Sequence, residues 1–217
     1  MRWIRDNSLS LVLVAIFLAS LAGQAFTGFH YENEQRTAHQ AAALSFPTYL
    51  ASGAFLSSVF ENWESEFLEK AAYVVLTAVL IQRGSAESKD PDAPKGEAPD
   101  TPEAQKPWPA RRNAPAPARW VYERSLGLAL FALFVGSFVL HWLNSARAEN
   151  VDKLLHGKPP EPLLAHLGSA TLWFQSFQNW QSEFLSTVVL VLLSIWLRQK
   201  ASPESKRIGT PDRATGR

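Results

Sequence analysis

The chain has 217 residues, a formal net charge of +1 at pH 7 and no cysteine. Such a balanced charge lacks the concentrated basic face that nucleic-acid binding needs. Without cysteine there is no disulfide, thiolate nucleophile or Cys-ligated metal centre. Most of the eight tryptophans lie near the ends of apolar runs, as aromatic residues at a membrane interface do. They are Trp3, Trp63, Trp120, Trp142, Trp180 and Trp196.

The first expected element is the apolar run Leu9–Phe29. Its length is close to the ~20 residues that a helix needs to cross ~30 Å of hydrocarbon. Arg2 and Arg5 precede it, which is also typical of a secretory signal peptide with an apolar core of about 7–15 residues. The run is longer than that, and an equivalent run recurs at Ser125–Leu143. We therefore interpret Leu9–Phe29 as a retained membrane helix.

The next apolar segment, Leu50–Gln82, would form a helix about 50 Å long, which is too long for one upright span. We therefore predict an interfacial or re-entrant helix at Leu50–Phe60. The membrane span would then begin within Trp63–Phe67 and end near Arg83. The corresponding segments of the second half are Leu167–Phe177 for the interfacial helix and Trp180–Lys200 for the span.

Residues 84–119 are rich in Pro, Ala, Asp, Glu and Lys and contain almost no branched apolar residues. This stretch holds more than half of the 14 prolines of the chain. It cannot bury enough apolar surface to order itself, so we expect an extended, disordered linker. Residues 201–217 have a similar composition and are expected to form a disordered tail.

Beyond the linker the chain repeats itself. With a shift of 117 residues and no gap, Asn62–Leu68 returns as Asn179–Leu185, and about a third of the paired positions are identical from Trp3/Trp120 to Lys89/Lys206. A single period of this length indicates one large duplicated unit rather than a solenoid repeat.

The basic residues predict the orientation, because an excess of Lys and Arg marks the cytoplasmic side of a membrane protein. We expect both termini and the linker to be cytoplasmic. The predicted fold is an all-α integral membrane protein with four transmembrane helices, arranged as two tandem duplicated pairs in parallel orientation. Its parts are a first membrane repeat (1–83), the linker (84–119), a second repeat (120–200) and the tail (201–217). The flanking basic residues are Arg2, Arg5, Arg83, Lys89, Arg119, Arg124, Arg198, Lys200, Lys206 and Arg207.

The repeated motif contains the candidate polar or ion site. Helical spacing places Asn62, Ser65 and Glu66 on one face, since residues three and four apart are neighbours. The second copy repeats this face with Asn179, Ser182 and Glu183. One hypothesis is that Glu66 and Glu183 face each other and hold a proton or cation, because an ionisable group at membrane depth is costly and usually functional.

Two other interpretations of the motif stay open. The motif could lie at the outer interface, where Trp63 and Trp180 anchor the helices and the carboxylates sit in hydrated headgroups. It could also hold the two halves together, because Asn and Ser hydrogen bonds help membrane helices to associate. The outer loops carry His39 and His156 at equivalent positions but no HExxH spacing, so we expect solvated histidines and no metal site.

The string Phe177–Leu185, followed by Leu197–Lys200 and Ser202–Lys206, resembles a family of uncharacterised bacterial integral membrane proteins classed as a domain of unknown function. The first half departs from this pattern, with Ala86 in place of Pro203 and glutamate in place of two glutamines. The resemblance covers both halves and implies location and topology. It implies no activity.

The sequence therefore favours a structural or interaction protein of the bacterial inner membrane. The alternative is a small transporter or channel-like protein that uses Glu66 and Glu183. We expect no enzyme and no cofactor, because no nucleophile motif, phosphate loop or metal cluster is present. The expected partners are the lipid bilayer and either a second copy or another membrane protein, and not nucleic acid.

Overall fold

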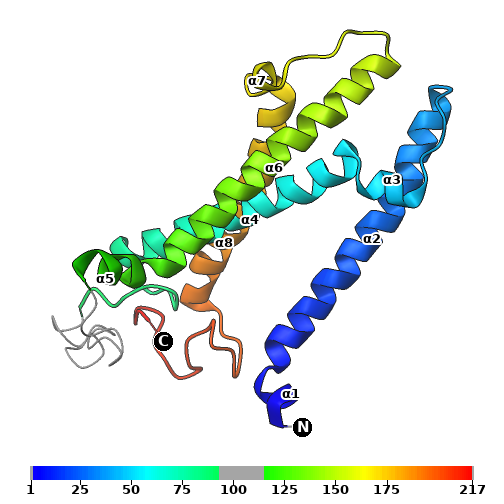
Figure 1. Cartoon of the computed structure of the whole chain (residues 1–217). Coiled ribbons are helices and arrows are strands. Elements are labelled where there is room, and N and C mark those ends of the chain that lie inside the picture. The colour runs from blue at the N-terminus through cyan, green and yellow to red at the C-terminus, as the bar shows by residue number, and fades with distance from the viewer. Residues whose placement is uncertain (1, 93–114, 217) are drawn as a thin grey trace. The chain divides into compact units, whose positions relative to one another are not determined.

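The computed structural model describes residues 2–92 and 115–216, and within these residues it contains helices and no strands (Figure 1). The contacts divide the chain into a first unit, residues 1–61 with 138–173, and a second unit, residues 62–137 with 174–217. Each unit is described by itself below. Most of the predicted linker, residues 93–114, lies outside the described residues.

Four long helices dominate the chain: α2 and α6 have 31 residues each, and α4 and α8 have 27 each. Shorter helices precede each of them. In chain order the helices are α1 (Arg2–Asp6), α2 (Ser8–Ala38), α3 (Phe46–Leu50), α4 (Gly53–Val79), α5 (Ala116–Glu123), α6 (Ser125–Leu155), α7 (Leu163–His166) and α8 (Ala170–Trp196).

Helices α2 and α6 are long and apolar enough to cross a membrane by length and composition. They contain the two apolar runs that the sequence predicts as the first span of each half. Only 6% of the most apolar window of α2 and 11% of that of α6 is buried, unlike the core helix of a soluble protein. Among the described residues, these are the two helices that meet this criterion.

The prediction of a separate interfacial helix at Leu50–Phe60 is wrong. Most of this segment forms the first turns of α4, which runs unbroken through the repeated motif to Val79. The chain breaks earlier, where Ser52 accepts a hydrogen bond from the backbone N–H of Phe55 at 3.3 Å. No proline or glycine follows between Ala54 and Trp63, so nothing ends the helix there. The second half behaves in the same way, because α8 includes most of Leu167–Phe177.

Close approach of backbones holds the first unit together. Gly53, the first residue of α4, lies so near α6 that a Cβ atom would be 2.7 Å from the Asn144 carbonyl oxygen and 2.7 Å from the Ala148 nitrogen. Helix α2 also meets α4, where Gln24 donates a hydrogen bond to Ser58 Oγ at 3.1 Å. The start of α4 thus contacts both apolar helices.

The tail forms turns in the second unit around a buried lysine. The Lys206 side chain is 1% exposed, and its ammonium donates to four backbone carbonyl oxygens at 2.6–3.1 Å. These carbonyls belong to Gly84, Ile195, Asp212 and Ala214. These contacts attach the tail, for which the composition predicts disorder, to the end of α8.

Candidate functional site

A row of carboxyl groups lies between α4 and α8 in the second unit. The carboxyl group of Glu183, on α8, lies close enough to Glu66, Glu69 and Lys70 of α4 to interact with them electrostatically. Glu66 is exposed and Glu183 is half-buried, which leaves the pair open on one side.

Two residues before Glu66, on another face of α4, the side chain of Glu64 is completely buried. Its Oε1 atom accepts hydrogen bonds from the Ser176 hydroxyl at 2.6 Å and from the Trp180 indole N–H at 3.1 Å. Both donors are on α8, so this carboxyl group ties the two helices together. The Trp180 ring also packs against Phe134 of α6.

Glu69 is the third carboxyl group of the row, and its side chain is 1% exposed. The Thr187 hydroxyl of α8 donates to Glu69 Oε1 at 2.5 Å, and the Lys70 ammonium donates to Glu69 Oε2 at 2.6 Å. Lys70 reaches outward and is mostly exposed. Glu69 is thus paired with an exposed cation.

The two motif serines bond within their own helices. The Ser65 hydroxyl donates to the Asn62 carbonyl oxygen at 2.8 Å, and the Ser182 hydroxyl donates to that of Asn179 at 2.8 Å. Each bond stays within one helix. Trp63 is half-buried on α4.

The sequence predicts Glu66 and Glu183 as site residues but not Glu64 and Glu69. The second half has Gln181 and Ser186 at the positions of these two glutamates, so the comparison of halves set them aside. The signal that could have found them is simpler. Acidic residues in or near a predicted span are functional candidates by default, whether or not the other half keeps them.

The first unit holds further buried ionisable groups. The fully buried His141 of α6 has its Nε2 atom 3.7 Å from Glu61 Oε2 of α4. His166 is also buried, and its Nε2 atom lies 3.0 Å from the Ser145 hydroxyl oxygen. These contacts join neighbouring elements of the unit, and they leave the acidic row as the richest set of titratable side chains on α4 and α8.

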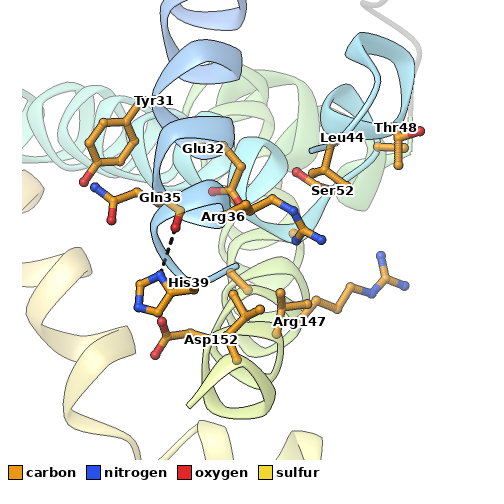
Figure 2. A pocket seen from close by; sticks show the side chains of 16 residues that line it. Tyr31, Glu32, Gln35, Arg36, His39, Leu44, Thr48, Ser52, Arg147 and Asp152 are labelled. Carbon is orange, nitrogen blue, oxygen red and sulfur yellow. Dashed lines mark hydrogen bonds between the residues drawn. The ribbon is translucent and has the colours of Figure 1, made fainter. Parts of the chain in front are cut away.

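The first unit also contains a cavity of about 560 Å³ near the ends of α2 and α6. Figure 2 shows the charged residues around it: Glu32, Arg36 and His39 come from the α2 side, and Arg147 and Asp152 from α6. Within the described residues, no group of three or more His, Cys, Asp and Glu side chains is arranged to hold a metal ion. The mixed charges give this cavity no strong preference for an anion or a cation.

No curated protein and no solved structure matches the chain. A family profile does match, over residues 1–217. Its description is "Domain of unknown function (DUF6766)", in agreement with the expected resemblance to an uncharacterised family. The chain therefore belongs to the DUF6766 family.

Proposed function

We propose that the chain is an integral protein of the bacterial inner membrane that crosses the bilayer four times. The observation that carries this proposal is that α4 buries acidic side chains and exposes apolar ones. Its carboxyl groups Glu64 and Glu69 are 0% and 1% exposed, whereas its apolar residues Val75 and Val79 are 56% and 72% exposed. A helix in water places its charges outward, and a helix in lipid does the opposite.

The apolar surface of α8 also supports a lipid environment. From Leu185 to Trp196 this helix exposes a nearly continuous apolar surface, and α2 does so from Leu9 to Leu18. Exposed apolar patches of this size are rare on soluble monomers. We expect the chain to stay in the membrane fraction after alkaline carbonate extraction and to need detergent for release. Recovery in the supernatant after ultracentrifugation without detergent would refute this proposal.

Local hydrogen bonds support a tandem duplication. Asn33 exchanges two hydrogen bonds with the Leu44 backbone, at 3.1 and 2.7 Å, and 117 residues later Asn150 exchanges two with Glu161, at 3.0 and 2.7 Å. The long helices also begin 117 residues apart, at Ser8 and Ser125 and again at Gly53 and Ala170. With the basic residues on one side, each half becomes a helix pair with cytoplasmic ends. A reporter fused after Arg217 tests this, because it should be active only if it folds in the cytoplasm.

The function that we propose is proton or cation handling at the Glu66–Glu183 pair. From Glu66 to the end of α4 at Val79 the helix rises about 20 Å, and this length supports a position of the pair inside a hydrocarbon layer of ~30 Å. A single charged carboxylate at membrane depth costs ~2.5–3.5 kcal/mol on insertion scales. Two carboxyl groups in contact avoid part of this cost by sharing one proton, and they can exchange that proton for a cation.

Flux in proteoliposomes tests this function. The double variant Glu66→Gln/Glu183→Gln keeps the shape and the hydrogen-bonding capacity of the pair but cannot release a proton. We expect the parent chain to carry proton or cation flux that the double variant loses, with equal yield and helix content. Glu34→Gln, on the exposed last turns of α2, is the matched control. Equal flux in the parent and the double variant, or no flux in the parent, would contradict the proposal.

A structural or interaction role is the second candidate. It is favoured by bulky side chains at both ends of α8 that are at least 57% exposed: Phe174, Phe177 and Trp196. Exposed aromatic residues of this kind suit contact with a second copy or with another membrane protein. Chemical cross-linking in native membranes, combined with the flux assay, distinguishes the two candidates. A purely structural protein would give a defined cross-linked adduct and no flux.

A further inference from the structure

The first unit brings together two histidines that occupy equivalent positions in the two halves. His39 follows the last residue of α2, and His156 follows the last residue of α6. Their ring centroids are 4.8 Å apart and the rings meet edge to face at 69°. Both side chains are exposed. Contact between two imidazole rings at the surface is a geometry that a shared ligand can use.

Hydrogen bonds fix the tautomer of both rings. His39 Nδ1 lies 2.9 Å from the Gln35 carbonyl oxygen, and His156 Nδ1 lies 2.9 Å from the Asp152 carbonyl oxygen. A carbonyl oxygen only accepts, so each Nδ1 carries the hydrogen. Each Nε2 atom therefore bears the lone pair in the neutral ring. Histidines that bind metals through Nε2 are oriented in this way, with Nδ1–H donating to a backbone carbonyl or a carboxylate.

The surroundings leave room for further ligands. His39 and Asp152 both line the cavity of about 560 Å³ (Figure 2). The Asp152 Oδ1 atom is also 3.4 Å from His156 Nδ1. The cations that face the same cavity, Arg36 and Arg147, are engaged elsewhere: Arg36 donates to the Ala42 carbonyl oxygen at 2.8 Å and Arg147 to Asn144 Oδ1 at 3.3 Å. The cavity can therefore supply water ligands to an ion at its rim.

We propose that His39 and His156 together bind a divalent transition metal ion of the imidazole-preferring class through their Nε2 atoms, with water in the remaining positions. This proposal does not depend on the function proposed for the Glu66–Glu183 pair. Imidazole suits Cu²⁺, Ni²⁺ and Zn²⁺, whereas Mg²⁺ and Ca²⁺ prefer oxygen ligands. Since affinities follow the order Ni²⁺ < Cu²⁺ > Zn²⁺, Cu²⁺ is the most sensitive probe.

The test uses the full chain in detergent, first stripped with a chelator and then titrated with Cu²⁺. We expect one site per chain, with an electron paramagnetic resonance spectrum that reports two imidazole nitrogens in the ligand plane. Zn²⁺ should compete for this site and Mg²⁺ should not. His39→Asn and His156→Asn should each weaken binding by at least about tenfold and leave one imidazole nitrogen in the spectrum.

His30→Asn is the matched control. His30 is also exposed on α2, but its ring contacts Phe26 and Phe29 rather than another histidine. This variant should bind Cu²⁺ as tightly as the parent. The proposal would be overturned by a parent spectrum with a single imidazole nitrogen, or by equal affinities in the parent and both loop variants. Circular dichroism verifies that the variants keep their helix content, so a weaker affinity cannot be attributed to unfolding.

Discussion

Tyr49 packs directly over Gly28, so closely that a Cβ atom on Gly28 would overlap the Tyr49 hydroxyl oxygen. The positions 117 residues later hold Ser145 and His166, whose Oγ and Nε2 atoms are 3.0 Å apart. Both rings are buried, at 4% exposure for Tyr49 and 1% for His166. The longer tyrosine thus meets a residue without a side chain, and the shorter histidine meets a hydroxyl group at the equivalent place.

This relationship predicts that Gly28 and Tyr49 can be replaced by serine and histidine, the residues of the second half, only when both are changed together. Gly28→Ser should destabilise the chain by about 1–3 kcal/mol, because its side chain enters space that Tyr49 fills. Tyr49→His should also destabilise it by about 1–3 kcal/mol through lost packing. The double variant should regain much of the loss, with a coupling of about 0.5–3 kcal/mol. Thermal unfolding in detergent measures all three, and simple additivity of the two losses would contradict the prediction.

The His166 pair also predicts a pH dependence. Burial lowers the pKa of His166 below its ordinary value of 6.5, because the imidazolium loses its hydration. The nearby carboxylates Glu149 and Glu161 oppose this shift without cancelling it. Above pH 6.5 the ring is neutral in both the folded and the unfolded chain. As the pH falls below 6.5, the unfolded chain binds the proton first, so the free energy of unfolding should decrease.

Unfolding midpoints between pH 7.5 and about 5 measure this decrease. The double variant Ser145→Gly/His166→Tyr carries the pair of the first half and has no imidazole at this position. It should show a smaller loss of stability over the same range. If the parent and the double variant lose stability equally, another titrating group is responsible and the assignment to His166 is wrong.

The long apolar helices could be predicted from the sequence, because an unbroken apolar run is a strong local signal. Leu9–Phe29 and Ser125–Leu143 both lie within helices long enough to span a membrane. The length argument failed at Leu50–Phe60, where it assumed that a helix of about 50 Å must be split. The chain shortens the helix instead, with a turn before Gly53 and an end at Val79.

From the sequence, candidate site residues could be proposed only where the repeated motif carries the same residue in both halves. Glu66 and Glu183 occupy the same position of the repeated motif, so the sequence predicts that the two form one site; this stays a prediction. Glu64 is held by Ser176 and Trp180, and nothing in the sequence pairs residues of unlike type across two helices. Lys206 was missed because its four partners are backbone carbonyls, which have no sequence signature.

The buried ammonium of Lys206 should be the main attachment of the C-terminal tail. Lys206→Met keeps the length of the side chain but leaves the surrounding carbonyl oxygens without a donor, at a cost of about 1–3 kcal/mol. We expect faster proteolysis after residue 200 in this variant. Lys89→Met is the matched control, since Lys89 is exposed at the equivalent position of the first half and donates to one carbonyl oxygen, that of Ala78, at 3.2 Å. Equal proteolysis of the two variants would show that the tail is held by other contacts.

Two glycines should respond in opposite directions to replacement by alanine. A Cβ atom at Gly53 would lie 2.7 Å from backbone atoms of Asn144 and Ala148, and backbone cannot rotate away as a side chain can. Gly53→Ala should therefore push α4 from α6 and destabilise the chain by about 1–3 kcal/mol.

Gly23 is inside α2 with no atom within 4 Å of the new Cβ. Gly23→Ala should stabilise the chain by about 0.5–1 kcal/mol, because alanine loses less backbone entropy in a helix. Unfolding in the same detergent compares the two variants, and a neutral Gly53→Ala would mean that the close contact of α4 with α6 does not hold the first unit together.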